Sequence, residues 1–161
     1  MSSYTAFLRV RHPSMDPAEL SSTLGLAPVH AWAAGSARAS DTGDGGRGKH
    51  PDTYWLAPLG DAGWHKSKAG EAAGADAGKF FWPPLQALPL EAFLLSQLRL
   101  LVPHKAFFAR LKAEGASCEV SVALAADERW EVDLPPTLLR ALADLNIGIT
   151  IEVSAEAELE A

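Results

Sequence analysis

Alternation of apolar side chains in three stretches constrains the fold of this chain more than any other feature. The stretches 4–11, 117–124 and 147–153 carry apolar residues at every second position. Successive side chains of a β-strand point to opposite faces, so this spacing predicts three strands, each with one buried face. A sheet built from such strands needs a covering layer on one side only.

A short helix with signals at both ends follows the first predicted strand. Asp16 suits the N-cap position, and Glu19, three residues later, would complete a capping box. Leu20 and Leu24 lie on one helical face, and Gly25 can take the left-handed conformation that ends a helix. The sequence therefore specifies where this helix begins and ends.

The rest of the chain contains helical leucine patterns and further short strands. Leucine and phenylalanine recur at helical spacing from Pro89 to residue 101, and Pro103 must break that helix because proline removes a backbone hydrogen bond. A second segment ends at Gly115. The stripe Leu138, Leu139, Leu142 and Leu145 predicts a last helix, with Asn146 as its left-handed cap.

Two further strands complete the set of elements. Residues 53–57 are rich in β-branched and aromatic side chains, which favours a short strand. Residues 117–124 and 130–134 both alternate and flank a short turn, which predicts a β-hairpin.

Together these elements predict an α+β fold with two layers, a mostly antiparallel sheet covered by helices on one face. The order is strand-helix-strand, long helix, hairpin, helix, strand, which we interpret as a ferredoxin-like variant. The length of 161 residues fits a single domain, 1–161. Few large apolar residues occur at about 33–52 and 60–84, so we expect flexible loops there, and we expect the acidic tail 154–161 to fray.

Charge and hydropathy exclude several functional classes. A net charge of −6 opposes binding to phosphate backbones, so nucleic acid is not an expected partner. No apolar run approaches the roughly 20 residues of a membrane span, and the N-terminus lacks the pattern of a secretory signal. Cys118 is the single cysteine, which agrees with a reducing compartment. We therefore expect a cytoplasmic protein that does not associate with membranes.

The sequence contains motifs that resemble catalytic or phosphate-binding patterns, but their context in the chain does not match those patterns. Residues 43–50 fit the glycine spacing of phosphate-binding loops, but a phosphate loop joins a buried strand to a helix, and here polar residues precede it and Pro51 follows. The histidines lack the spacing of a zinc pair, and Cys118 falls on the apolar side of its strand. We predict no catalytic residue, no metal site and no cofactor.

Aromatic and basic residues gather around the two predicted loops. Such a mixture can bind an anionic or aromatic ligand, or contact a protein partner. For Trp32 and Trp55 a core position that pins the loops is the favoured interpretation. The candidate ligand- or partner-binding residues are Trp32, Arg38, Arg47, Lys49, His50, Trp55 and Trp64.

Several segments occur in an order that matches a known family. They are the strand YTAFLRV, the helix and its exit DPAELSSTLGLAP, Trp32 and Gly35, the pair Trp55 and Leu56, the helix LLSQLRLLVPH, and LLRALADLNIGITIEV. The chain thereby resembles the bacterial family called domain of unknown function 4279, over nearly its whole length apart from 61–84. Glu152 and Ser154 stand where similar proteins tend to have Asp and Tyr. The resemblance implies a fold and no established activity, so no catalytic residue is carried over.

The preferred functional hypothesis is a non-enzymatic protein-binding or regulatory module. Its working surface would lie near Trp32, Trp55 and the two Gly-rich loops. One specific version is an immunity-type protein that blocks a basic target with its acidic surface.

Two other classes stay open at this point. In a small-molecule or anion-binding protein, or an enzyme, that uses the 33–52 loop, Arg38, Arg47 or Lys49 would hold an anion and His50 or Asp44 would act as acid-base group. In a structural homo-oligomer, an exposed edge strand such as the last one would pair with a second copy. The expected state is thus a monomer or a homodimer.

Overall fold

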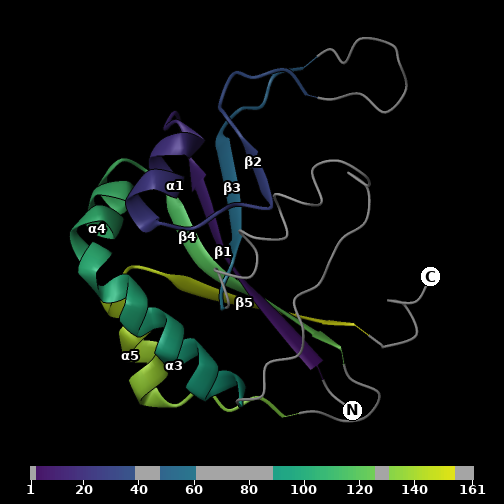
Figure 1. Ribbon diagram of the computed structural model, residues 1–161, viewed down its shortest axis with the longest axis vertical. Coiled ribbons are helices and arrows are strands. Elements are labelled where there is room, and N and C mark those ends of the chain that lie inside the picture. Colours follow the sequence, from purple (N-terminus) through teal and green to yellow (C-terminus); the bar gives the residue numbers. More distant parts are fainter. Residues whose placement is uncertain (1–2, 39–47, 61–88, 126–130, 155–161) are drawn as a thin grey trace.

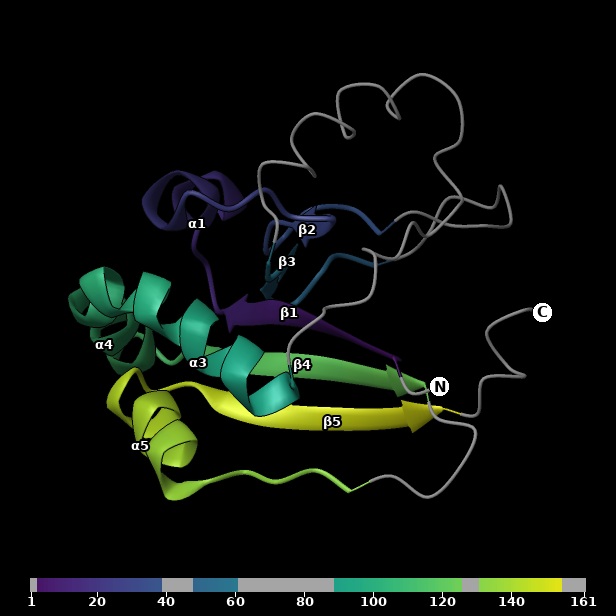
Figure 2. The same cartoon turned by 60° about the horizontal axis from the view of Figure 1, so that its bottom comes forward.

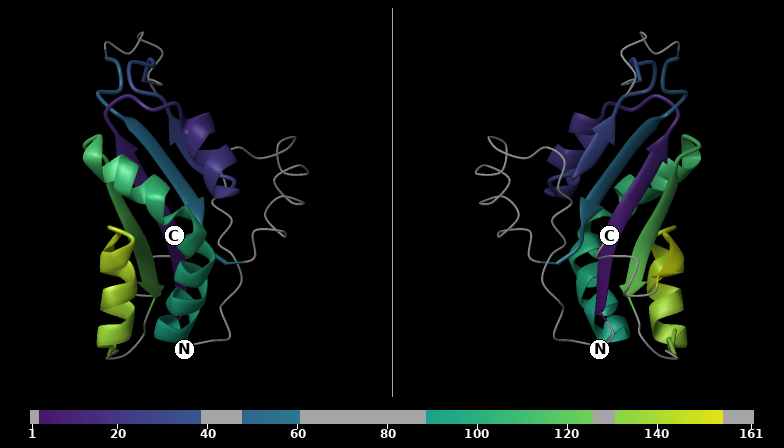
Figure 3. Two further views of the ribbon diagram at one scale, coloured as in Figure 1. Left: turned by 90° about the vertical axis from the view of Figure 1, so that its left-hand side faces the viewer. Right: turned by 90° about the vertical axis from the view of Figure 1, so that its right-hand side faces the viewer.

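The computed structural model describes residues 3–38, 48–60, 89–125 and 131–154. Within them, five strands form one sheet in the order β2-β3-β1-β4-β5. The helices pack on one face of this sheet, and Figures 1 and 3 show the two layers. The predicted α+β architecture with helices on one face is therefore confirmed.

Strand β1 (Ser3–His12) is central, and it pairs antiparallel with β3 (Thr53–Pro58) on one side and with β4 (Ser117–Ala125) on the other. The edge strand β2 (His30–Trp32) is antiparallel to β3. At the opposite edge, β5 (Gly148–Ser154) is parallel to β4, and Figure 2 shows the two strands side by side with the same direction. The sheet is mostly antiparallel, as predicted, with one parallel pair.

Strand β4 does not form the predicted hairpin with residues 130–134. Both of its edges are occupied, by β1 and by β5, so no edge remains for another strand. Residues 131–135 have no strand structure, and Val132 and Leu134 pack against the core instead. Residues 126–130 lie outside the described part of the chain. Local alternation indicates an extended, half-buried segment but does not select its pairing partner.

Helix α1 (Pro17–Leu24) begins and ends as predicted. The carboxylate of Asp16 accepts a hydrogen bond of 2.9 Å from a backbone amide of the first turn. Gly25 has a φ of 66° and ends the helix. The Glu19 carboxylate, predicted to complete a capping box, accepts a hydrogen bond of 2.9 Å from Arg110, and no bond to it from the Asp16 amide is present.

The other described helices follow the leucine pattern. They are α3 (Leu90–Leu101), the short 3-10 helix η1 (Val102–His104), α4 (Lys105–Ala113) and α5 (Pro136–Asp144). Pro103 lies in η1, where it separates α3 from α4 as predicted. Asn146 has a φ of 55° after α5. Leu139 was predicted to join the apolar stripe of α5, but it is 45% exposed because it points away from the sheet.

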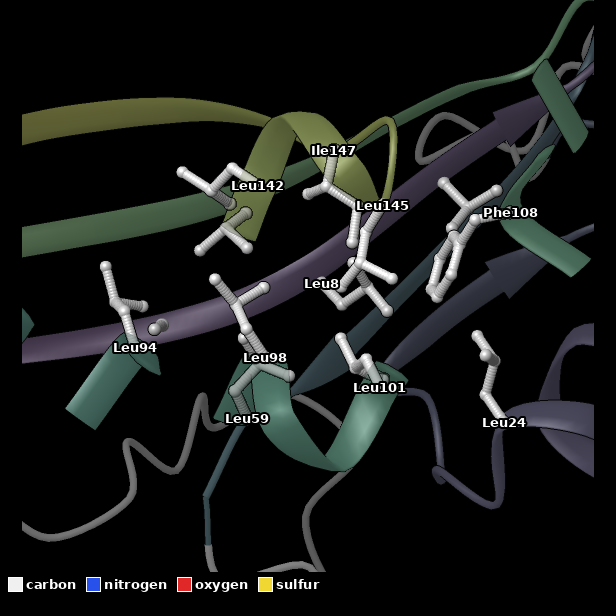
Figure 4. Close-up of a cluster of buried hydrophobic side chains, with 14 of the residues drawn as sticks. Leu8, Leu24, Leu59, Leu94, Leu98, Leu101, Phe108, Leu142, Leu145 and Ile147 are labelled. Carbon is white, nitrogen blue, oxygen red and sulfur yellow. The ribbon is translucent and has the colours of Figure 1, made fainter. Parts of the chain in front are cut away.

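Leucine side chains fill the space between the helices and the sheet. Leu8 of β1 is fully buried, and Leu98, Leu101 and Leu142 from α3 and α5 are nearly so. Figure 4 shows these side chains, together with Phe108 of α4, converging from both layers. One continuous core therefore joins the sheet to its helical cover.

A buried histidine ties the end of β1 to two helices. Nδ1 of His12 accepts hydrogen bonds from the backbone amides of Ser14 and Met15, at 3.0 and 2.8 Å. The proton is therefore on Nε2, which lies 2.8 Å from the Glu114 carboxylate and donates to it. Arg110 donates to the other oxygen of that carboxylate at 2.9 Å. Through Arg110, this network also holds the start of α1.

In the described ranges, no helix combines the length and hydrophobicity needed to cross a membrane. Most of the predicted loop 60–84 and of the tail 154–161 lies outside those ranges.

A matched pair of leucines on α3 tests the core assignment. Leu98 is 2% exposed and Leu100 is 68% exposed. We expect Leu98→Ala to lower the free energy of unfolding by about 2–5 kcal/mol through loss of burial and a residual cavity. Leu100→Ala, at a surface position, should change it by less than about 1 kcal/mol. Urea unfolding measures both, and equal losses would contradict the assignment.

Stability should depend on the ionisation of Glu114. Hydrogen bonds from Arg110, and then from His12, hold the pKa of this carboxyl below its usual 4.5. A depressed folded pKa stabilises the protein above the unfolded pKa, and this stabilisation is lost as the pH falls through the folded value. Thermal unfolding should therefore show Glu114→Gln least stable relative to wild type near neutral pH, with the difference shrinking below pH 4.5. The exposed Glu131→Gln is the control, with no such pH-dependent difference.

Candidate functional site

The face of the sheet opposite the helices carries the candidate site. Figure 3, right, shows this face with the helices behind it. Strand register places Trp32, Tyr54 and Arg11 in one row across β2, β3 and β1. Leu56 and Arg9 stand in the next row, which continues into β4. Side chains that alternate away from the core thus form two adjacent rows on this side, which no described helix covers and which we call the open face.

The first row is a stack of aromatic rings ended by a cation. Trp32 and Tyr54 have ring centroids 4.4 Å apart and an interplanar angle of 15°. The His50 ring stacks on Trp32 at 4.6 Å and 21°. The guanidinium of Arg11 lies over Tyr54, 5.3 Å from its centroid. We call these four residues, His50, Trp32, Tyr54 and Arg11, the aromatic row.

Backbone pairing outside the regular strands holds His50 in place. Residues 33–38 and 48–52 run beside each other as an arm that extends from β2 and β3 (Figure 1). His50 accepts a backbone hydrogen bond of 2.8 Å from Gly35 and donates one of 2.9 Å to Ser36. Gly35 has a φ of 79°, which glycine adopts readily and other residues rarely. Backbone hydrogen bonds therefore join the two ends of the predicted 33–52 loop, while 39–47 lies outside the described residues.

An ion pair occupies the second row. Nε and one terminal nitrogen of Arg9 both lie 2.5 Å from Oε1 of Glu119. The hydroxyl of Thr150 donates to the other carboxylate oxygen at 2.7 Å. Burial alone would lower the pKa of the Arg9 guanidinium, but the charge and hydrogen bond of Glu119, with a contribution from Tyr54, raise it above its usual value. The charge of Arg9 is therefore compensated within the protein.

The structure brings together some of the predicted binding residues and separates others. Trp32 and His50 are in direct contact, and Arg38 and Lys49 are exposed on the arm that carries His50. Trp32 is only partly buried and lies on the open face, so its predicted core position is wrong. Arg47, Trp64 and Asp44 lie outside the described residues.

Trp55 does not belong to the candidate site. It is fully buried on the helical side of the sheet, where its indole nitrogen donates to the Ser21 hydroxyl of α1 at 3.0 Å. Neighbouring residues of a strand point to opposite faces, so Tyr54 faces the open side because Trp55 faces the core. The predicted core position of Trp55 is confirmed, and its side chain has no exposed surface in this structure.

Sequence reasoning missed the residues that β1 and β4 contribute. Arg9, Arg11 and Glu119 all fall on the non-apolar positions of alternating strands. Their alternation assigned them to the outer face, but only the pairing of β1 with β3 and β4 places them beside Tyr54 and each other. The alternation of side chains along each strand can be read from the sequence, whereas the register between neighbouring strands cannot.

The described residues contain no group of three or more His, Cys, Asp and Glu side chains that could hold a metal ion. Burial raises the pKa of the Cys118 thiol to about 11, so the reactive thiolate is scarce near neutral pH.

Comparisons of the chain with protein-family models, with curated proteins and with solved structures find no match. The resemblance to the domain of unknown function 4279 family stays a prediction from the sequence segments that carry it.

Two tryptophans should differ in their contribution to stability. Trp55→Ala removes a fully buried ring and should lower the free energy of unfolding by ~3–5 kcal/mol. Trp32→Ala loses two ring stacks and partial burial, and we expect about 1–3 kcal/mol. Urea unfolding of both variants checks this order, and a larger loss for Trp32→Ala would contradict the assignment of the two faces.

Proposed function

We propose that this protein is a non-enzymatic binding module whose partner is another protein and whose contact surface is the aromatic row. The supporting observation is the stack of Trp32 on Tyr54 and His50, ended by Arg11, on the open face. Trp, Tyr and Arg dominate the energetics of protein interfaces. Side chains that are already held in one arrangement lose less conformational entropy when a partner binds.

The orientation of the rings favours a protein over a single-stranded nucleic acid. Proteins that bind RNA on an open sheet offer free aromatic faces on which bases stack. Here the faces of Tyr54 are directed toward Trp32 on one side and Arg11 on the other. The row therefore offers ring edges, a guanidinium and hydrogen-bonding groups, which suit side chains and backbone of a protein. The net charge of −6 also disfavours binding to the phosphates of a nucleic acid.

The alternative of an anion-binding protein or enzyme receives less support. Arg38 and Lys49 are exposed on the arm, and His50 is engaged in the stack on Trp32. A described cavity of about 180 Å³ lies elsewhere, between α3 and α5, lined in part by Leu98 and Leu145. Among the described residues, the recorded partner of the His50 ring is Trp32, and no carboxylate contacts it as an acid-base partner would.

Affinity capture with matched variants tests the proposal. We expect a protein retained by the wild-type chain to be lost with Tyr54→Ser, which removes the centre of the row. Arg140→Gln, an exposed change on α5, is the control and should retain it. Circular dichroism shows that each variant is folded before capture. Equal capture by Tyr54→Ser and wild type, or no specific partner at all, would contradict the proposal.

A further inference from the structure

The charges on the open face specify the chemistry of the partner, an inference that rests on the proposed function. Two guanidinium groups from β1 point to this face, and they differ in their surroundings. Arg9 is partly buried and neutralised by Glu119, whose other oxygen is bound by Thr150. Arg11 is exposed, and its contact among the described residues is with the ring of Tyr54.

A guanidinium over an aromatic ring keeps its donor groups available at the edge of the plane. Cation-π contact holds Arg11 from one side, while its N–H groups can form paired hydrogen bonds to a carboxylate. Glu119, the carboxylate of the second row, cannot supply it because it is already bound by Arg9 and Thr150. Among the described residues no carboxylate forms an ion pair with Arg11, so its donor groups are available to an acid from another molecule.

Further positive charge lies near the same end of the sheet. Arg11 is the penultimate residue of β1 and pairs with Tyr54, and the arm begins directly beyond that row. Arg38 and Lys49 are exposed on the arm and carry no ion pair within the described ranges. Asp52, which is partly exposed, is the one acidic residue on the described part of the arm, whereas Glu119 and Glu152 lie toward β5. The free positive charge is thus concentrated beside the aromatic row.

We infer that the partner contacts the aromatic row with an acidic segment of polypeptide, one carboxylate of which pairs with Arg11. The charge of this partner is opposite to that of the basic target that the net charge alone suggested. Because the whole chain is acidic, long-range attraction does not assist this contact, and it depends on the local arrangement of Arg11 and the arm.

Titration with poly-L-glutamate, followed by the indole and guanidinium N–H signals in NMR spectra, tests the inference. Trp32→Phe and Arg11→Gln assign the two signals. We expect saturable shifts at Trp32 and Arg11, and a loss of affinity of about tenfold or more with Arg11→Gln, since a charged hydrogen-bonding partner is removed. Arg140→Gln should leave the affinity unchanged.

Other outcomes overturn the inference. Absence of saturable shifts, equal affinity in Arg11→Gln, or binding of poly-L-lysine to the row would each do so. Equal binding of polyuridylate would show a general polyanion site instead of an acidic-peptide site. If capture of a native protein still depends on Tyr54 while poly-L-glutamate fails to bind, the proposed function stands and the acidic-partner inference alone is wrong.

Discussion

The burial of one side of β1 is the interaction on which the rest of the structure depends. Leu8 and Val10 are fully buried beneath the helices, and both edges of the strand are paired. With a period of two, burial of these residues forces Arg9 and Arg11 onto the opposite face. A shift of one residue would place two guanidinium groups in a leucine core, at a cost of several kcal/mol each. The core therefore fixes the register, and the register fixes the candidate site.

Much of the local structure could be predicted from the sequence because it depends on neighbours along the chain. Asp16 and Gly25 delimit α1, and Pro103 separates α3 from α4, for reasons contained in a few adjacent residues. What could not be predicted was pairing. Strand β4 takes β1 and β5 as partners, not the segment that follows it, and β2 with its arm has too few apolar side chains to be recognised. For the same reason Trp32 and Trp55, both aromatic and both near loops, received the same interpretation although they lie on opposite faces.

The two faces of the sheet use polar groups in different ways. On the helical side, His12 and Trp55 form hydrogen bonds within the protein, which join β1 to the C-terminal end of α4 and β3 to α1. On the open side, Arg9 and Glu119 neutralise each other, whereas Arg11 in the neighbouring row has no ion pair with a described residue. The ion pair of Arg9 and Glu119 also holds the surface next to Tyr54 in one arrangement. Rigidity and available charge are thus supplied by adjacent rows of the same sheet.

The place of β4 in the sheet has a consequence for how the chain folds. Arg9 and Glu119, neighbours across β1 and β4, are separated by 110 residues in sequence. During synthesis, β1, α1, β2 and β3 are complete long before β4 exists. One edge of the central strand β1 is therefore unpaired, and its apolar face is incompletely covered, until the C-terminal half has been made. Pairings of such sequence separation slow folding and prolong the exposure of unpaired strands. Until β4 has been synthesised, the nascent N-terminal half therefore carries an unpaired strand edge of the kind that promotes aggregation.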